Sequence, residues 1–276
     1  MTDRKGKVIL LTGASSGIGY ETARKLAAQG HVVYAAARRV ERMQGLAADG
    51  IHIMRMDVTD DASMVEAVNS IIAEQGRIDV LVNNAGYGYF GPVETVSMEN
   101  AREQLEVNLF GLARLTQLVL PHMREQHSGR IVNVSSVAGK VVLVNGGWYN
   151  VSKFAVEALS DALRIEMKPF GVDVVLIEPS GIRTPWGQIA ADHLSECTAG
   201  TPYEKSGAKE AAIMHYAYQS RFLSGPSCVV GSISRAVNAR RPRVRYRPGR
   251  GAGMMVFFHA ILPARWWDAM NRLAVR

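Results

Sequence analysis

One stretch of this chain predicts the fold: Lys7-Val8-Ile9-Leu10-Leu11-Thr12-Gly13-Ala14-Ser15-Ser16-Gly17-Ile18-Gly19. Its apolar first part is typical of a strand buried in a parallel sheet, and a helical pattern follows its last glycine. Glycines in such a turn let the backbone approach a pyrophosphate, because no Cβ stands in the way. The first amides of the following helix can then hold the anion. The stretch predicts a strand, a phosphate-binding turn and a helix; the alternative is a tight turn without a ligand.

Six further apolar runs are predicted as strands, and helical stretches lie between them. The strands are Val32–Ala37, Ile51–Met56, Val80–Val82, Ile131–Val134, Val172–Ile177 and Val244–Tyr246, and the helical stretches include 61–75, 98–122 and 150–168. Strands that alternate with helices form a parallel sheet with helices on both faces. We therefore expect a single α/β domain, a Rossmann-type doubly wound parallel sheet of about seven strands flanked by helices.

Polar residues and turns follow several of the predicted strands. Besides the glycine turn, Asp57, Asn84, Ser136 and Pro179 each come shortly after a strand. Doubly wound sheets bind their ligands at the carboxyl ends of the strands. These residues are therefore expected to gather at one edge of the sheet.

Tyr149 and Lys153 stand four residues apart, a spacing that puts both side chains on one face of a helix. A phenol with its ordinary pKa of about 10 is a poor acid or base at neutral pH. A neighbouring cation favours the phenolate and lowers that pKa, so the pair could transfer protons near neutrality. Taken alone, the spacing also describes many solvated helix faces.

The chain resembles the short-chain dehydrogenase/reductase family over about residues 5–185. The motifs that carry the resemblance occur in the family's order and at its usual separations: Thr12-Gly13-x-x-x-Gly17-Ile18-Gly19, Asp57-Val58, Asn83-Asn84-Ala85-Gly86, Asn108, Ser136 and Tyr149-x-x-x-Lys153. The resemblance implies a nicotinamide-dependent oxidoreductase that interconverts a carbonyl and a hydroxyl group.

The resemblance also implies a catalytic tetrad of Tyr149, Lys153, Ser136 and Asn108. Tyr149 would exchange a proton with the substrate oxygen, and Lys153 would lower the pKa of Tyr149 and bond the nicotinamide ribose. Ser136 would donate to the oxygen on which charge develops. Asn108 would help to anchor a water that connects Lys153 to solvent, although an Asn inside a helix can also serve structure alone. The hydride would come from the cofactor.

The end of the second predicted strand bears on the choice of nucleotide. An acid there would bond the ribose hydroxyls of NAD, but Ala37 occupies the position and Arg38 and Arg39 follow it. Guanidinium groups suit a phosphate, so we expect NADP(H) to be preferred over NAD(H), with Arg38 on the phosphate; the alternative is two ordinary surface charges. The cofactor-binding residues implied by the family are Gly13, Ser15, Ser16, Gly17, Ile18, Gly19, Arg38, Asp57, Val58, Asn84, Ala85, Gly86, Tyr149, Lys153, Pro179, Ile182 and Thr184.

The segment after the sixth strand departs from the family pattern. Many members have Pro-Gly where this chain has Pro179-Ser180-Gly181. Serine adopts a positive φ poorly, so we expect Gly181 to absorb the turn. Thr184 still falls where the family threonine contacts the cofactor.

Residues 185–225 are expected to form a lid over the substrate. The lid is rich in Met and aromatic residues, which favours an apolar substrate, although many of these side chains could simply pack the lid onto the sheet. Expected substrate contacts are Ser136, Tyr149, Val142 and Trp186. The lid and the stretch from Glu178 to Thr184 look similar to the hydroxysteroid- and retinol-dehydrogenase-like branch, which implies a steroid-, retinoid- or lipid-like alcohol or ketone.

Composition limits the remaining possibilities. With 276 residues, 47% of them hydrophobic, the chain can bury one large core. It has no apolar run of the ~20 residues that span a membrane, and residues 1–5 do not resemble a secretory signal. The two cysteines, Cys197 and Cys228, are expected to be reduced thiols, so we expect a cytoplasmic protein. No metal-ligand spacing is apparent, and no metal is expected.

The net charge of +7 is uneven, because residues 231–276 hold ten Arg and one acid. We expect a domain over 1–250 and a basic, apolar C-terminal extension over 251–276. The extension could pack on the domain or on a second subunit, with the arginines of residues 231–276 solvated around it. It could instead contact a membrane peripherally, since Trp and Arg beside an apolar segment suit that interface. Nucleic acid is not expected as a partner, because no binding module is present.

Helices 98–122 and 150–168 resemble those with which family members assemble, so a homodimer or homotetramer is expected. A non-catalytic NADPH-binding sensor or scaffold is the alternative to an enzyme. The complete set of Asn108, Ser136, Tyr149 and Lys153 favours the enzyme, because binding alone has no chemical need of all four.

Overall fold

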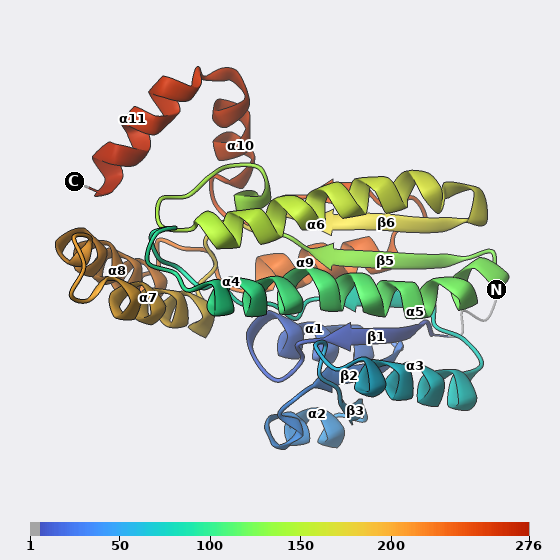
Figure 1. The fold of residues 1–276 in the computed structure, drawn as a ribbon. Coiled ribbons are helices and arrows are strands. Elements are labelled where there is room, and N and C mark those ends of the chain that lie inside the picture. Colours follow the sequence, from blue (N-terminus) through green and yellow to red (C-terminus); the bar gives the residue numbers. More distant parts are fainter. Residues whose placement is uncertain (1–5, 276) are drawn as a thin grey trace.

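A seven-stranded parallel sheet runs through the computed structural model, which describes residues 6–275 (Figure 1). Its strands are β1 (Val8–Thr12), β2 (Val32–Ala37), β3 (His52–Arg55), β4 (Val80–Asn83), β5 (Gly129–Val134), β6 (Val172–Ile177) and β7 (Arg245–Tyr246). They lie side by side in the order β3-β2-β1-β4-β5-β6-β7, and all neighbouring pairs are parallel. This is the Rossmann order, which reverses between β1 and β4, and sheets of this kind bind ligands at the carboxyl ends of the strands near that point. The predicted fold class is confirmed.

Helices cover both faces of the sheet because its strands are apolar on both sides. Along β1, Ile9 and Leu11 belong to one buried cluster, and Val8 and Leu10 to another on the opposite face. The first cluster includes side chains of α1 (Gly17–Ala27), α2 (Gln44–Ala48) and α9 (Ser227–Asn238). The second includes side chains of α3 (Asp61–Gln75) and α5 (Gly111–Glu125), and α6 (Gly147–Glu166) packs beside them against β6.

Two predicted helices differ from the structure in ways that affect the site. The expected continuous helix 98–122 is divided into α4 (Met98–Leu105), a π-helical turn η2 (Glu106–Phe110) and α5, which continues to Glu125. The helix expected at 150–168 begins at Gly147 and ends at Glu166, so Tyr149 lies within its first turn. Short 3-10 turns occur at η1 (Val40–Met43), η3 (Val137–Gly139) and η4 (Lys168–Phe170).

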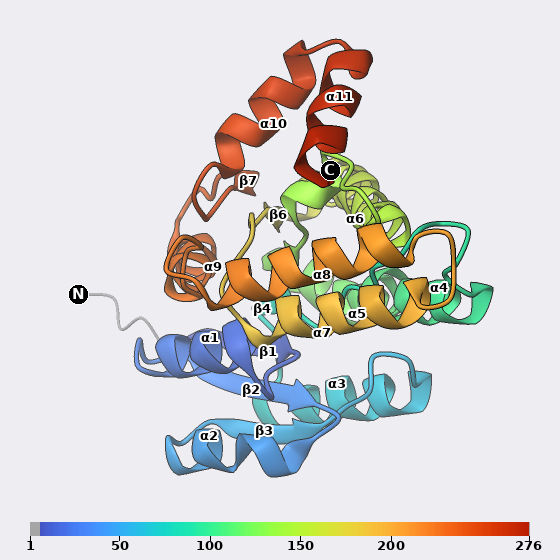
Figure 2. The ribbon, with the colours of Figure 1, turned by 90° about the vertical axis from the view of Figure 1, so that its left-hand side faces the viewer.

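The segment expected to be a lid forms a pair of helices beyond the carboxyl ends of the strands. Figure 2 shows α7 (Pro185–Thr198) and α8 (Glu204–Gln219) side by side. They approach closely where Gly207 meets Thr198, since a Cβ on Gly207 would lie 2.3 Å from Thr198 Oγ1. A bridge between Ile182 and Ser224 closes the base of the lid.

The C-terminal extension forms two helices, α10 (Ala252–Ile261) and α11 (Ala264–Val275). They rise from the end of β7 as a hairpin, and α11 returns toward α8 (Figures 1 and 2). No helix within residues 6–275 combines the length and the apolarity that crossing a membrane requires. Residues 1–5, on which the expected lack of a secretory signal rests, and residue 276 lie outside the described residues.

Two arginines of the basic stretch 231–276 are ion-paired with buried acids, so the prediction that the arginines of this stretch are solvated is wrong for these two. Arg245 lies 2.8 Å from the buried Glu178 carboxylate and 2.6 Å from Asp161. Its Nη2 is also 3.2 Å from the buried Glu157 carboxylate. Arg247 lies 2.6 Å from the second oxygen of Glu178. These pairs hold the short strand β7 to β6 and α6.

Candidate active site

The glycine turn between β1 and α1 has a conformation and a closeness of approach that only glycine allows. Gly13 and Gly17 have φ angles of +67° and +54°. A Cβ on Gly13 would lie 2.9 Å from the Cα of Ala85, and a Cβ on Gly19 would lie 2.2 Å from the Gly13 oxygen. The start of α1 is therefore pressed onto the end of β1, as a phosphate-binding turn requires.

Asn84 and Thr12 lock this turn to the end of β4. Thr12 Oγ1 accepts from the main-chain N–H groups of Asn84 at 3.0 Å and Ala85 at 2.9 Å. The Asn84 side-chain amide donates to the main-chain oxygens of Thr12 and Gly13, at 3.1 and 3.3 Å. The Asn84 side chain thus supports the shape of the predicted nucleotide site.

The amino end of α1 is open to an anion. Its N-cap, Ser16, makes no side-chain capping bond, and no acid stands in the first turn. Thr184 faces this end, since a Cβ on Gly17 would lie 3.9 Å from the Thr184 methyl carbon. Uncapped amides and the helix dipole fit the pyrophosphate of a dinucleotide.

The residues predicted to hold the adenosine end lie after β2 and β3. Arg38 and Arg39 follow β2, both are exposed, and neither forms an ion pair with an acid in the described part of the chain. Asp57 Oδ1 accepts from the Thr59 N–H at 3.0 Å and from its hydroxyl at 2.8 Å. The main-chain oxygen of Val58 contacts the start of α5, where a Cβ on Gly111 would lie 2.2 Å away.

The four residues of the predicted tetrad come together at the carboxyl edge of the sheet. Tyr149 and Lys153 lie on α6, and Lys153 Nζ is 5.8 Å from the centroid of the Tyr149 ring. Lys153 donates to the main-chain oxygen of Val134, at the end of β5, at 3.0 Å. Ser136 caps the start of η3 and lies close enough to the Tyr149 phenol to act on its pKa. A Cβ on Gly86 would lie 3.0 Å from Asn108 Oδ1 and 3.6 Å from Lys153 Nζ.

Asn108 lies in the π-helical turn and connects three segments. Its side-chain oxygen accepts from the Tyr87 N–H at 3.0 Å, and its amide donates to the Tyr87 oxygen at 2.9 Å. The same amide donates to Ser152 Oγ at 3.1 Å. The Ser152 hydroxyl donates in turn to the main-chain oxygen of Tyr149 at 2.7 Å. Both amide hydrogens of Asn108 are thus used by protein atoms, and π turns of this kind are frequent at functional sites.

Burial dominates the ionisation of the Tyr–Lys pair. It raises the pKa of the Tyr149 phenol far above its ordinary value, while the hydrogen bond with Ser136 acts in the opposite direction. Burial also lowers the pKa of Lys153 to about 8, although the Glu157 carboxylate opposes this shift. Burial thus sets the net direction of the Tyr149 shift, and the expected lowering of this pKa by the Lys153 cation stays a prediction.

Aromatic side chains enclose the Tyr149 ring. The ring centroid of Trp186, at the start of α7, is 5.2 Å from that of Tyr149, and the centroid of Phe90 is 5.6 Å away. Trp186 also contacts Phe90 edge-on and lies 6.2 Å from the Tyr218 ring on α8. Trp186 is therefore beside the phenol, and Val142 is 52% exposed; that both contact the substrate stays a prediction.

The loop after β6 makes its turn without a positive φ at either Ser180 or Gly181, so the prediction that Gly181 absorbs the turn is wrong. The left-handed residue lies instead in the facing segment, at Gly249, whose φ is +103°. A Cβ there would lie 2.3 Å from Ser180 Oγ. Ser180 donates to the main-chain oxygen of Arg250 at 3.2 Å, and this contact explains a serine at the position. Pro179 accepts from the Val137 N–H at 2.9 Å, and Ile182 is buried.

Glu157 is a residue of the site that sequence reasoning missed. It is buried one helical turn after Lys153 and lies 3.1 Å from Lys140 and 3.2 Å from Arg245. Its i+4 spacing from Lys153 was the available signal. Two histidines of the lid have partners in the structure: His193 stacks on Tyr89, and His215 Nε2 lies 3.1 Å from an Asp192 carboxylate oxygen.

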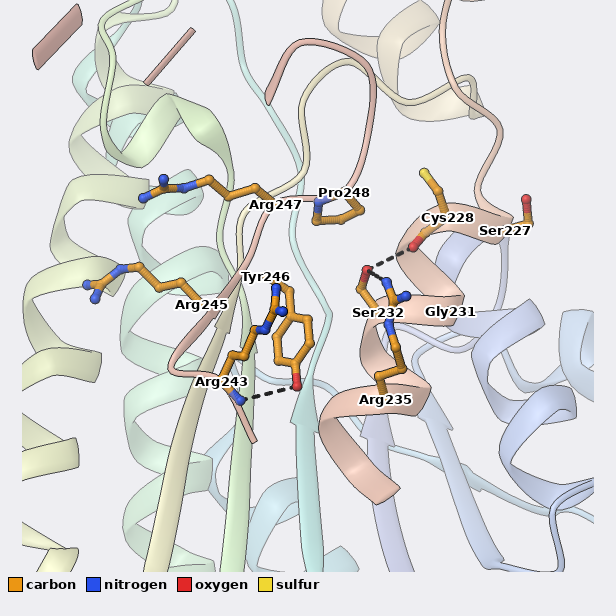
Figure 3. Close-up of a pocket in the computed structure, with 10 residues that line it drawn as sticks. All are labelled: Ser227, Cys228, Gly231, Ser232, Arg235, Arg243, Arg245, Tyr246, Arg247 and Pro248. Carbon is orange, nitrogen blue, oxygen red and sulfur yellow. Dashed lines mark hydrogen bonds between the residues drawn. The ribbon is translucent and has the colours of Figure 1, made fainter. Parts of the chain in front are cut away.

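A separate hollow of about 760 Å³ lies between α9 and β7 (Figure 3). Arg243 and Arg235 lie along it, whereas Arg245 and Arg247 point away toward their acidic partners. The hollow contains none of the predicted site residues. Within residues 6–275, no group of three or more His, Cys, Asp or Glu side chains is placed to hold a metal ion.

Comparison with known proteins finds relatives that are dehydrogenases or reductases. The profile described as short chain dehydrogenase matches residues 7–194. The probable short-chain type dehydrogenase/reductase VdlC of Helicobacter pylori is 35% identical over 268 residues, which cover 96% of this chain and 97% of that protein. Retinol dehydrogenase 5 of Mus musculus is 34% identical and covers 95% of this chain and 86% of that protein. A solved short-chain dehydrogenase from Streptomyces avermitilis has a TM-score of 0.80 at 32% identity, covering 94% of this chain and 93% of that one.

The fold and the site together define a dinucleotide-dependent oxidoreductase, with a phosphate-binding turn beside a Tyr–Lys pair. The chain belongs to the short-chain dehydrogenase/reductase family, as its motifs indicated. Solved relatives that are 26% identical to this chain include one in complex with NADP and one in complex with NAD. Membership of the family therefore does not decide between the two nucleotides.

Proposed function

We propose that this chain is an NADP(H)-dependent oxidoreductase that interconverts a carbonyl and a hydroxyl on an apolar, steroid-, retinoid- or lipid-like substrate. One observation carries the proposal: Tyr149, Lys153, Ser136 and Asn108 converge at the carboxyl edge of the sheet, beside the uncapped end of α1. A non-catalytic sensor or scaffold would require only the nucleotide site.

The tetrad residues divide the work on the substrate oxygen. Tyr149 remains a phenol at neutral pH because burial raises its pKa, so it is ready to donate a proton during reduction. Ser136 steadies the same oxygen by donating a hydrogen bond to it. Lys153 is a cation at neutral pH, and its charge stabilises the phenolate that forms. Asn108 positions the loop at Tyr87 and, through Ser152, the first turn of α6. The bound nucleotide supplies the hydride, and the chain supplies its binding and orientation.

The proposed nucleotide contacts follow the edge of the sheet. The turn from Gly13 to Gly19 and Thr184 hold the pyrophosphate, Lys153 bonds the nicotinamide ribose, and Asp57 to Val58 border the adenine. Arg38 carries the preference for NADP(H), because it is exposed after β2 and free of an acidic partner within residues 6–275.

Replacing Arg38 with Asp tests this preference. The ratio of kcat/KM for NADPH to that for NADH should fall at least about tenfold, since a lost charge-assisted contact is worth roughly 1.5 to 3 kcal/mol. Arg39→Asp is the matched control, because it changes the neighbouring exposed charge equally. If the ratio is the same in wild type and Arg38→Asp, Arg38 does not bind the phosphate.

The apolar substrate is supported by the aromatic surroundings of Tyr149. Trp186 and Phe90 present carbon surface next to the phenol, and Tyr218 lies behind Trp186. Val142, three residues after the end of η3, is exposed. Retinol dehydrogenase 5, by its name, acts on such a molecule. NADPH oxidation measured against a panel of ketones and aldehydes tests the class. We expect kcat/KM to rise with the apolar size of the substrate; higher values for small polar carbonyls would contradict the proposal.

We also propose that the chain forms a homodimer or homotetramer and acts in the cytoplasm. Phe110 in η2 and Val151 and Phe154 on α6 are exposed, although α6 and η2 pack against one another. A second copy would bury these side chains. Both cysteines are free thiols in the structure, as is usual in a reducing compartment.

A further inference from the structure

The C-terminal hairpin exposes an unusually apolar surface. Phe257 is 59% exposed and Trp266 is 68% exposed. Met254, Met255, Phe258 and Ile261 on α10 and Met270 on α11 are exposed as well. Soluble monomers rarely expose contiguous apolar patches beyond a few hundred Å². A surface of this kind marks a site of contact with another protein or with a membrane.

The hairpin is already seated on the body by its opposite side. Val256 and Trp267 pack against a buried cluster that contains Val137, Val141 and Ala252. The exposed side chains point away from this contact, and both views show the two helices projecting from the body (Figures 1 and 2). One side of the hairpin is thus buried against the domain, and the opposite side remains exposed.

The loop that follows α8 extends the apolar surface at the foot of α10. Phe222 is 76% exposed. Arg250, just before α10, donates to the main-chain oxygen of Phe222 at 3.2 Å, and its N–H donates to Ser224 Oγ at 3.1 Å. The hairpin surface is defined here as Phe222, α10 and the exposed side chains Trp266 and Met270 of α11.

Positive charge surrounds this surface. Arg221 and Arg250 lie at its foot and Arg265 at the far end of α10, and all three are exposed. From residue 248 to the end, the chain has four Arg and a single acid, Asp268. No ion pair joins Arg221, Arg250 or Arg265 to an acid within residues 6–275.

This charge favours a lipid surface over a second copy of the chain. A two-fold contact through the hairpin would bring the same patch of each copy together, and so arginine toward arginine. An anionic bilayer offers hydrocarbon for the Met and Phe side chains and headgroup charge for the arginines. Trp side chains favour the same interface.

We propose that the hairpin surface binds peripherally to anionic membranes, with α10 lying in the interface. The helix is too short to cross the bilayer, so contact is parallel to the surface. The hairpin packs on η3, which begins beside Ser136, and this would bring the site close to lipid. Membrane binding does not rest on the proposed activity, and a Tyr149→Phe protein should bind equally well.

Flotation of the full chain with vesicles tests the proposal. We expect the wild type to float with an equal mixture of phosphatidylcholine and phosphatidylglycerol, and to remain in the soluble fraction with phosphatidylcholine alone. Binding should weaken as salt is raised, because the charges are exposed. A wild type that fails to float with the mixed vesicles would overturn the proposal.

Matched variants assign the binding to the hairpin. The double variant Phe257→Ser, Phe258→Ser should bind at least about tenfold more weakly, since two exposed side chains lose their burial in lipid. Arg265→Gln should cost about fivefold. Ile165→Ser, which removes an exposed apolar side chain at the far end of α6, should bind as wild type does.

Light scattering on the same proteins tests whether a second copy of the chain, and not a membrane, covers the hairpin surface. We expect the double variant to keep the wild-type molecular mass in solution. A smaller assembly in that variant, or equal flotation of all variants, would show that the hairpin surface serves another purpose and would refute the proposal.

Discussion

Lys153 shows how a buried position sets the charge of a single residue. Its pKa is lowered from 10.5 to about 8 in the folded protein, so between these values the unfolded chain binds a proton that the folded chain does not. The free energy of unfolding should therefore rise with pH across this window, by up to about 1.4 kcal/mol per pH unit. Urea unfolding of wild type and Lys153→Met between pH 7 and pH 10 measures the effect as the difference between the two curves.

The same series with Lys168→Met provides the control, because Lys168 is exposed. It removes an exposed lysine in the same way, so the pH dependence that is specific to Lys153 is the difference between the two series. Parallel curves for wild type and Lys153→Met would mean that Lys153 keeps its ordinary pKa, and that burial does not govern the Tyr–Lys pair.

At the residue scale, the sequence predicted which residues form the candidate site, but it did not predict the burial and charges around them. The tetrad was predicted from motif order, and the structure brings its members together. The burial of Tyr149, which raises its pKa, was missed, because it depends on Trp186 and Phe90, which lie far from Tyr149 in the sequence. Glu157 was missed for a related reason: its charge matters through Lys140 and Arg245.

Among the strands, β7 is the shortest and pairs only with β6. It has only two residues, and ion pairs to Glu178, Glu157 and Asp161 attach it to the body. Arg245→Met should leave the buried carboxylates of Glu178 and Glu157 short of a partner, which costs about 3 kcal/mol of unfolding free energy. Arg247 and Lys140 remain near them and limit the loss. Urea denaturation measures the change.

Arg243→Met is the control for this element, because Arg243 lies two residues away and is exposed. Its effect should be within about 0.5 kcal/mol. Equal stability of the Arg245 and Arg243 variants would show that the ion pairs do not hold β7.

The elements themselves were largely predictable where the apolar pattern was long. The helix 61–75 has the expected bounds, since Asp60 caps its start and the left-handed Gly76 ends it. The π turn at Asn108 was not predictable, because it depends on the bonds between Asn108 and Tyr87. The positive φ at Gly249 was likewise missed, since that residue faces Ser180 only in the folded chain.

At the scale of the whole molecule, the proposed homo-oligomer can be tested by substituting the exposed apolar side chains of α6 and η2. Phe154→Arg should place a charge in the proposed contact between copies and shift the protein toward monomer, since an unpaired buried charge costs several kcal/mol. Analytical ultracentrifugation measures the mass. Ile213→Arg, which alters an exposed apolar residue of α8, should keep the wild-type assembly. A monomeric wild type would contradict the proposed oligomer.

The measurement that tests the central claim most directly is NADPH oxidation by wild type and Tyr149→Phe, with NADPH binding followed by fluorescence in both. The variant removes only the hydroxyl that is placed to donate the proton. We predict that kcat falls by about a hundredfold or more while NADPH affinity is retained. Turnover of the same carbonyl substrate at the wild-type rate by Tyr149→Phe would contradict the account.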